Sequence, residues 1–162
     1  MNIGIDIDDT ISNTAESFFK YGKKFNEERN IKHTIMPKEW DFDKAFGWDE
    51  EQAHDFLKTY LEELFIGLEP KEGAVEIINK LKEEGNKIIV ITARSVDHLE
   101  NVHQICKEWL RRHNINVDKI ETDGKDKALK CKENNIDIFI DDRCISLRKC
   151  TQHAKNTSTF NG

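Results

Sequence analysis

Three aspartates occupy three of four consecutive positions near the start of the chain. Asp6, Asp8 and Asp9 lie in the sequence GIDIDDT, directly after a short apolar stretch. Like charges this close repel each other and resist joint burial, so stability alone would not place them at the end of a buried strand. We therefore expect a cation or a reaction to be the reason for the cluster.

Polar side chains also accompany two later apolar runs. Thr92 ends the run IIVIT, and Asp141 and Asp142 follow the run IFI. Lys125 and Lys127 lie between these runs, in DGKDKALK, at the start of an expected helix. In open α/β sheets, ligands bind beyond the carboxyl ends of the strands. We expect these groups to gather there with the first acidic cluster.

Carboxylates, a hydroxyl group and an ammonium group are suited to holding a phosphoryl group and a hard cation. Mg²⁺ prefers oxygen ligands and keeps several waters, so two carboxylates and a substrate oxygen can complete its coordination. Strand alternation puts Asp6 and Asp8 on the same side, so one can attack phosphorus while the other moves protons. Lys127 and Thr92 would bind phosphoryl oxygens, with Lys125 as the alternative lysine.

The order of the elements predicts an α/β fold. Apolar runs predict strands at 2–7, 86–92, 117–122 and 136–142, and helical patterns occur at 13–30, 49–65, 74–85, 95–114 and 125–135. Strands that alternate with helices imply right-handed crossovers and a parallel sheet covered on both faces. The irregular, aromatic-rich segment from Ile31 to Gly67 predicts a small helical insertion, and the tail predicts a short helix and an edge strand.

The motifs resemble those of the haloacid dehalogenase superfamily of phosphohydrolases. Its pattern is D-x-D-x-T, then Thr or Ser, then Lys, then an acidic pair, and this chain has DIDDT, VITAR, GKDKA and FIDDR in that order. The resemblance implies a three-layer, Rossmann-like α/β/α core with a cap inserted after the first strand. It also implies that Asp6 is the nucleophile, that Asp8 is the acid and base, and that Thr92 and Lys127 bind phosphate.

The same resemblance implies the metal ligands. Mg²⁺ would lie on Asp6, on the backbone carbonyl of Asp8 and on Asp141, and Asp142 would orient one of its waters. Ala93 and Arg94, which follow Thr92, are further candidates for substrate binding. For Arg94 the alternative is an ion pair with the acidic edge of the sheet.

A narrower resemblance covers most of the chain. LFIGLEPKEGAVEIINKL and IFIDDR are similar to the 5′(3′)-deoxyribonucleotidase family and its bacterial members. That family removes phosphate from nucleoside monophosphates under a small helical cap. By this resemblance residues 1–14 and 70–162 form the catalytic core and 15–69 the cap. Members of the family carry an aromatic residue eight positions after the nucleophile, where this chain has Thr14.

The aromatic residues of EWDFDKAFGW allow two interpretations. Trp40 and its neighbours Phe42, Phe46 and Trp48 could form a roof that contacts substrate, or they could form the core of the insertion itself. Two other functions share parts of the motif set. A receiver domain would carry its motifs in a different order, and a phosphate-binding regulatory protein would have lost a catalytic residue, which this chain has not.

Composition excludes some functions. The 162 residues carry 25 Lys and Arg against 31 Asp and Glu, a net charge of -6, without the basic stripe typical of nucleic-acid binders. No apolar run approaches the roughly 20 residues that span a bilayer. We expect a cytoplasmic enzyme with a small phosphorylated substrate, no nucleic-acid polymer, no membrane association and reduced cysteines, and we leave open whether it forms a homodimer.

Overall fold

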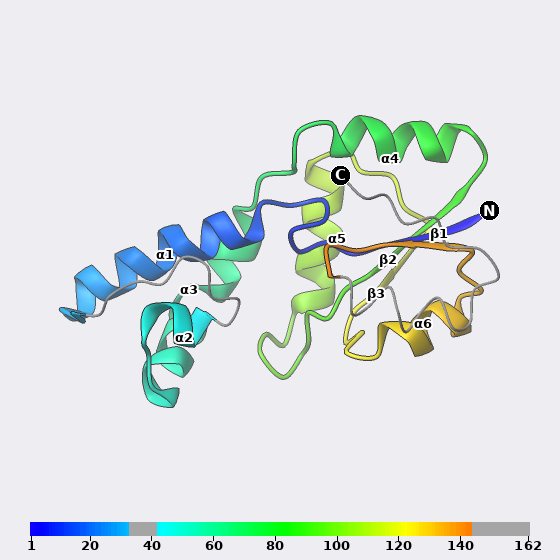
Figure 1. Ribbon diagram of the computed structural model, residues 1–162. Helices are drawn as coiled ribbons and strands as arrows, with labels where there is room; N and C mark the ends of the chain where they lie inside the picture. Colours follow the sequence, from blue (N-terminus) through cyan, green and yellow to red (C-terminus); the bar gives the residue numbers. More distant parts are fainter. Residues whose placement is uncertain (33–41, 144–162) are drawn as a thin grey trace. The chain divides into compact units, whose positions relative to one another are not determined.

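A parallel sheet of four strands organises the larger part of the molecule, in a computed structural model that describes residues 1–32 and 42–143. The strand order is β3-β2-β1-β4 (Figure 1). The strands are β1 (Asn2–Ile5), β2 (Lys87–Ile91), β3 (Lys119–Glu121) and β4 (Ile138–Ile140). This confirms the α/β fold that the alternation of strands and helices predicts.

The chain divides into two compact units, which are described separately. One comprises residues 1–13 and 69–162, and it contains the sheet with α4 (Ala74–Glu83), α5 (Val102–Arg112) and α6 (Lys127–Glu133). The other comprises residues 14–68 and contains α1 (Thr14–Arg29), α2 (Phe42–Phe46) and α3 (Glu50–Ile66). The second unit is the helical insertion.

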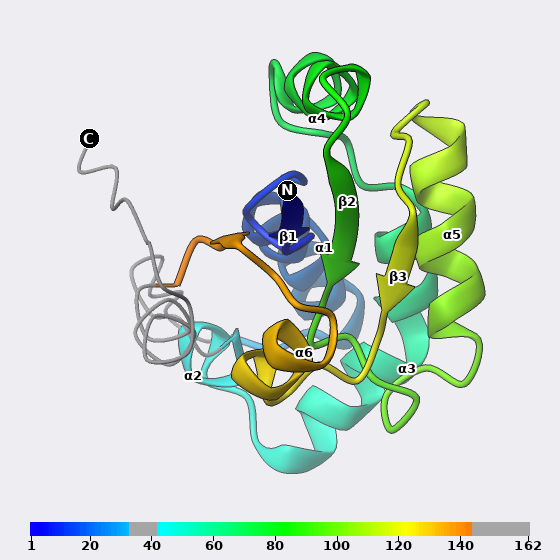
Figure 2. The same cartoon turned by 90° about the vertical axis from the view of Figure 1, so that its right-hand side faces the viewer.

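The direction of the crossovers places the helices of the first unit on two faces of the sheet. From β1 through β2 to β3 the chain steps one way across the sheet, so right-handed crossovers put α4 and α5 on one face. The connection from β3 to β4 steps back past β2 and β1, which puts α6 on the other face. Figure 1 shows α4 and α6 on opposite sides of the strands, and Figure 2 shows β2 beside β3.

Alternate residues of β2 serve the two faces, as the continuous apolar run requires. Ile89 and Ile91 pack with Cys131 of α6 and Phe139 of β4 in one buried cluster. Gly4 at the centre of β1 makes room for this packing, because a Cβ atom there would lie 2.7 Å from a ring carbon of Phe139. The core thus fixes β1 against β4 next to the point where both strands end.

Aromatic rings fill the interior of the insertion. Phe42 stacks on Phe18 at a centroid distance of 4.1 Å, and Phe46 stacks on Trp48 at 4.7 Å. The indole N–H of Trp48 donates to Oδ1 of Asn26 across 2.6 Å. These described aromatics therefore form a core of the insertion's own, while Trp40 lies outside the described residues.

One helix starts later than its sequence pattern predicts. The pattern predicts a helix over 95–114, but α5 begins at Val102. The side chain of Asp123 accepts a hydrogen bond from the Val96 N–H across 3.0 Å, and Ser95 Oγ accepts one from the Asp97 N–H across 3.1 Å. These contacts hold the first residues of the pattern in a loop. The predicted elements of the tail lie outside the described residues.

Candidate active site

The motif residues of the first unit meet at the carboxyl edge of the sheet, where the strand order reverses. Ile5 pairs with Val90 of β2 on one side and with Ile140 of β4 on the other. The Asp6 N–H donates to the Ile140 carbonyl across 3.0 Å, so Asp6 and Asp141 leave neighbouring strands at the same level. Such a reversal is where open α/β sheets bind ligands.

Lys127 joins the first and last acidic motifs. Its Nζ atom lies 3.0 Å from Oδ2 of Asp6 and 2.6 Å from Oδ2 of Asp141. All three side chains are nearly or fully buried, with exposed fractions of 10%, 5% and 0%. Burial alone would lower the pKa of Lys127, but the two carboxylates raise it, so the lysine is held as a cation.

Asp6 is an unusual carboxyl group. Burial raises its pKa to about 7; the Lys127 ammonium opposes the rise, while the charge of Asp8 adds to it. Its Oδ1 atom is buried, and no group in the described part of the chain forms a hydrogen bond with it. A buried carboxylate oxygen without a partner there indicates that a group outside the described residues completes the site.

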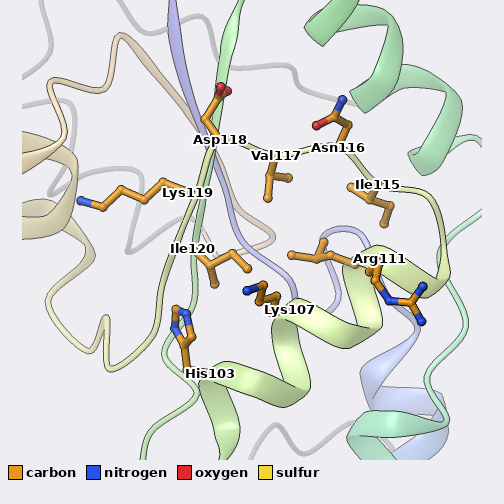
Figure 3. A pocket seen from close by; sticks show the side chains of 10 residues that line it. His103, Lys107, Arg111, Ile115, Asn116, Val117, Asp118, Lys119 and Ile120 are labelled. Atoms are coloured by element: carbon orange, nitrogen blue, oxygen red, sulfur yellow. The ribbon is translucent and has the colours of Figure 1, made fainter.

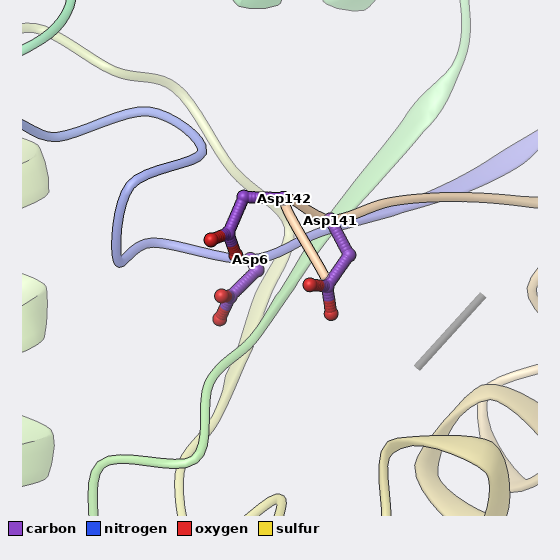
Figure 4. A group of neighbouring side chains, drawn as sticks. All are labelled: Asp6, Asp141 and Asp142. Carbon is purple, nitrogen blue, oxygen red and sulfur yellow. The ribbon is translucent and has the colours of Figure 1, made fainter. Parts of the chain in front are cut away.

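A divalent cation fits this place. One carboxylate oxygen from each of Asp6, Asp141 and Asp142 lies within 4.8 Å of the others (Figure 4). Burial raises the pKa of Asp142, and the neighbouring charges of Asp141 and Asp9 raise it further, as is usual where carboxylates crowd without a cation. An all-oxygen set of this kind is the type that Mg²⁺ prefers.

Thr10 ties the first motif to the last. Its hydroxyl accepts a hydrogen bond from the Asp142 N–H across 3.0 Å, and the Arg143 N–H donates to Oδ1 of Asp141 across 2.8 Å. Thr10 is the threonine of the DIDDT motif. Its contact with a residue 132 positions away has no signal in a single sequence.

Asp8 pairs with a different cation. Arg94 donates from Nη2 to Oδ1 of Asp8 across 2.7 Å and from Nε to Oδ2 across 3.0 Å. Thr92 Oγ1 lies 3.5 Å from the same Oδ2 atom and accepts a hydrogen bond from the Arg94 N–H across 3.3 Å. Of the two alternatives for Arg94, the structure therefore contains the ion pair with the acidic edge. Thr92 is fully buried and Ala93 is exposed.

The two candidate lysines differ in their surroundings. Lys125 pairs with Asp97 across 2.7 Å, and both side chains are 64% exposed. Lys127 lies two residues further along, as the first residue of α6, and reaches Asp6 and Asp141. The geometry thus brings Lys127 into the acidic cluster and leaves Lys125 on the surface.

The segment after Asp8 forms a tight turn that leads to the insertion. The N–H groups of Thr10, Ile11 and Ser12 all point to the Ile7 carbonyl at 3.0–3.3 Å. The Lys71 side chain donates to the Asp9 carbonyl, a contact that the sequence gives no reason to expect. The outgoing and returning connections then pair, through Asn13 N–H to Glu69 O at 3.0 Å and Lys71 N–H to Ile11 O at 2.9 Å.

An open hollow of about 560 Å³ lies elsewhere, along α5 and the β3 edge (Figure 3). It is lined by His103, Lys107, Leu110, Arg111, Ile115, Asn116, Val117, Asp118, Lys119 and Ile120. None of these residues belongs to the motifs, and the perturbed carboxyl group Asp6 is not among them. We therefore place the chemistry at the carboxyl edge of the sheet and not in this hollow.

Residues 1–157 match the family of the 5′ nucleotidase, deoxy (pyrimidine), cytosolic type C protein. The chain belongs to this nucleotidase family. The nucleotidase is therefore an enzyme of the phosphatase class, and its substrate is a small phosphorylated molecule.

Two similar curated proteins carry the name "Putative nucleotidase". The one from Bacillus cereus is 29% identical over 169 residues, which cover 98% of this chain and 87% of the relative. The one from Oceanobacillus iheyensis is 31% identical over 119 residues, which cover 72% of this chain and 61% of the relative. Both likenesses agree with the family to which the nucleotidase belongs.

Solved structures of haloacid dehalogenase-like hydrolases share the fold. One from Streptococcus pneumoniae superposes with a TM-score of 0.69 at 10% identity, covering 93% of this chain and 80% of the other. One from Geobacter sulfurreducens gives a TM-score of 0.63 at 15% identity, with 94% and 84% covered. These likenesses confirm the fold that the superfamily resemblance implies. Within residues 1–32 and 42–143 the nucleotidase has no helix long and apolar enough to cross a membrane.

Proposed function

We propose that the nucleotidase hydrolyses phosphomonoesters with the help of Mg²⁺, through an aspartyl phosphate formed on Asp6. The observation that carries this proposal is the contact of one lysine, Lys127, with the carboxylates of both Asp6 and Asp141 at the reversal of strand order. A lysine beside a nucleophilic carboxylate can hold the phosphoryl oxygens on which charge develops during the reaction.

Asp6 and Asp141, with the backbone carbonyl of Asp8, would hold Mg²⁺, and Asp142 would stand beside it. The partnerless Oδ1 atom of Asp6 supports this assignment. When bound, the ion would neutralise the phosphoryl group and screen the carboxylates from one another.

In the first step a carboxylate oxygen of Asp6 attacks phosphorus. The bond from phosphorus to the ester oxygen breaks, and that oxygen takes a proton from the Asp8 carboxyl group and leaves as an alcohol. Lys127 lies where it can follow the phosphoryl oxygens as they move from the substrate to Asp6. The nucleophile and the acid thus come from the segment after β1, and the cation comes from the start of α6.

In the second step water attacks phosphorus of the aspartyl phosphate. Asp8, now a carboxylate, takes a proton from this water, and the bond between phosphorus and the Asp6 oxygen breaks. Inorganic phosphate leaves, and both aspartates return to their starting states. One residue thus serves as acid and then as base.

We propose nucleoside monophosphates, with pyrimidine deoxynucleotides among them, as the substrates. The family to which the chain belongs supports this class. Thr14 stands where the deoxyribonucleotidases carry an aromatic residue, so a nucleobase would need another contact in this enzyme. Trp40 is our candidate for that contact.

The insertion is proposed to act as a cap that excludes water from the aspartyl phosphate. Its outgoing and returning connections pair directly after the turn that follows Asp8, which supports this role. Trp40→Ala should then weaken hydrolysis of a nucleotide far more than that of a small aryl phosphate. Equal losses on both substrates would assign Trp40 to the core of the insertion.

Phosphate release from a panel of nucleoside monophosphates, sugar phosphates and aryl phosphates tests the proposed function. We expect activity that requires Mg²⁺, disappears with EDTA and is highest on nucleotides. The phosphate analogue beryllium trifluoride should attach to Asp6 and be visible by ¹⁹F NMR. Binding of phosphate esters without any turnover would instead support the regulatory alternative.

A further inference from the structure

Among the cations that form ion pairs with motif carboxylates in the described residues, Arg94 is the most completely buried, and its partner is Asp8. The guanidinium group holds both oxygens of Asp8, with contacts of 2.7, 3.0 and 3.3 Å from Nη2 and Nε. The Arg94 side chain is 2% exposed, whereas that of Asp8 is 30% exposed. The arginine lies behind the carboxylate, and the carboxylate keeps the exposed surface.

The backbone of Arg94 is fixed on both sides. Its N–H donates to Thr92 Oγ1 across 3.3 Å, and its carbonyl accepts from the Asp123 N–H across 2.8 Å. Gly124 N–H also donates to the Thr92 carbonyl across 2.9 Å, which ties the loop after β2 to the loop after β3. These contacts fix the backbone from which the Arg94 side chain extends.

The far end of the guanidinium group is held as well. Nη1 lies 3.8 Å from the sulfur of Cys106, a fully buried residue of α5. Because the guanidinium group is planar and is held at both ends, its Nε and Nη2 atoms donate to Asp8 from fixed positions. A lysine ammonium cannot do this. The carboxylate that the guanidinium group holds is therefore fixed in orientation too.

This geometry does not suit direct contact with substrate. A 2% exposed guanidinium group would have to leave Asp8 to reach a phosphoryl oxygen, and it would then leave a motif carboxylate without its ion pair. Lys127 already places a cation on Asp6 at 3.0 Å, on the side of the acidic cluster. The two cations thus hold different carboxylates: Lys127 contacts Asp6 and Asp141, and Arg94 contacts Asp8.

We infer that Arg94 is a positioning residue that acts through Asp8, holding its carboxyl group in the orientation needed to pass a proton to the leaving oxygen. The inference rests on the proposed function, in which Asp8 is the acid and base. Arg94 itself touches neither substrate nor phosphorus. Its contribution appears only where the leaving group needs the proton.

A series of aryl phosphates tests this inference, since acidic phenols leave without a proton and weakly acidic phenols need one. We compare the parent with Arg94→Lys, Asp8→Asn and the double variant, and use Arg111→Lys as the matched control, because Arg111 is exposed and pairs with the exposed Glu108. For Arg94→Lys, kcat/KM should fall by about threefold on dinitrophenyl phosphate and by about 100-fold on phenyl phosphate.

Inhibition by inorganic phosphate separates positioning from direct binding. Arg94→Lys should leave the inhibition constant of phosphate within about twofold of the parent, because no phosphate contact is lost. An equal loss of kcat/KM on every substrate, together with weaker inhibition by phosphate, would overturn the inference and make Arg94 a substrate ligand. Arg111→Lys should match the parent throughout.

The double variant supplies a second criterion. If Arg94 acts through Asp8, adding Arg94→Lys to Asp8→Asn should cause no further loss; independent losses that multiply would overturn the inference. Arg94→Gln replaces Arg94→Lys if the latter melts below the assay temperature. We expect the same increase in the loss of kcat/KM from dinitrophenyl phosphate to phenyl phosphate.

The same data distinguish the two levels of the argument. If Asp8→Asn lost the same factor in kcat/KM on every aryl phosphate, the result would contradict the acid role of Asp8 and hence the proposed mechanism. The loss of kcat/KM in Asp8→Asn could instead grow as the leaving phenol becomes less acidic, while the loss in both Arg94 variants stays the same for every phenol. That result would support the proposed mechanism and overturn only the role of Arg94.

Discussion

The carboxyl edge of the sheet and the interior of the helical insertion are built from opposite kinds of side chain. At the edge, Lys127 and Arg94 each hold motif carboxylates that are partly or fully removed from water. Inside the insertion, rings such as Phe46 and Trp48 pack face to face, and the polar group of Trp48 is satisfied by Asn26. Burial of rings stabilises a fold, whereas burial of like charges opposes it.

This difference indicates that the carboxyl edge of the sheet governs activity and that the ring core of the insertion governs stability. The buried Oδ1 atom of Asp6 has no hydrogen-bond partner among the described residues, and a purely structural site would not retain that cost in free energy. Substitutions at the charged edge should therefore change catalysis more than folding. Substitutions among the rings should change folding first.

Asp6→Asn gives the largest expected effect. Loss of the proposed nucleophile should lower kcat by roughly 10³-fold or more, because the proposed aspartyl phosphate could no longer form. Steady-state phosphate release measures the loss, and the melting temperature without metal should stay equal to or above that of the parent, since a buried carboxylate has been removed. An active Asp6→Asn variant would contradict the assignment of catalysis to the carboxyl edge of the sheet.

Lys127→Met comes next. Removing one well-placed cation should lower kcat/KM by about 100-fold, whereas Lys125→Met should lower it by less than about threefold. The reason is that Lys127 contacts Asp6 while Lys125 pairs with Asp97 on the surface. The reverse order of losses would show that the lysines exchange roles when substrate binds.

Gly22→Ala tests the other region. A Cβ atom at this position of α1 would lie 2.4 Å from a ring carbon of Phe46, so the ring pack must shift. We expect a loss of about 1–3 kcal/mol in the free energy of unfolding, measured in urea. The exposed neighbour Lys23→Ala serves as control and should change stability by less than about 0.5 kcal/mol. An unchanged midpoint for Gly22→Ala would show that the ring packing is loose.

Asp118→Asn gives the smallest expected effect and sharpens the contrast within the first unit. Asp118 accepts hydrogen bonds from Lys82 and from the Ile88 N–H, away from the carboxyl edge of the sheet, and the Lys82 contact lowers its pKa below the usual 3.8. Because the folded pKa is depressed, the stabilisation is present above pH 3.8 and is lost as pH falls through the folded value.

Urea unfolding of the parent and of Asp118→Asn measures this contribution. The parent should be more stable by about 0.5–1 kcal/mol at neutral pH, and the two proteins should converge as the pH falls below 3.8. The activity of the variant should be unchanged. A difference that persists in acid would mean that the hydrogen bond to Ile88, and not the charge, carries the effect.

Much of the site was predictable because its signals are local. The acidic motif after a short apolar strand, the Thr after IIVIT and the acidic pair after IFI each lie within a few residues of a strand end. Since parallel strands bring their carboxyl ends to one edge, the sequence alone predicts that Asp6 and Asp141 lie close together. The prediction of a helix over 95–101 was wrong, because the side chain of the distant Asp123 holds that segment as a loop.

The class of fold, the order of the motifs and the acidic edge follow from the sequence alone, because strand and helix periodicity and motif spacing are properties of short segments. Which cation pairs with which carboxylate depends on how these segments pack in three dimensions. Lys125 and Lys127 are two positions apart in one motif, and the direction of α6 alone brings one of them to Asp6. Arg94 and Asp8 are separated by 86 positions, and only the pairing of β1 with β2 sets their loops side by side.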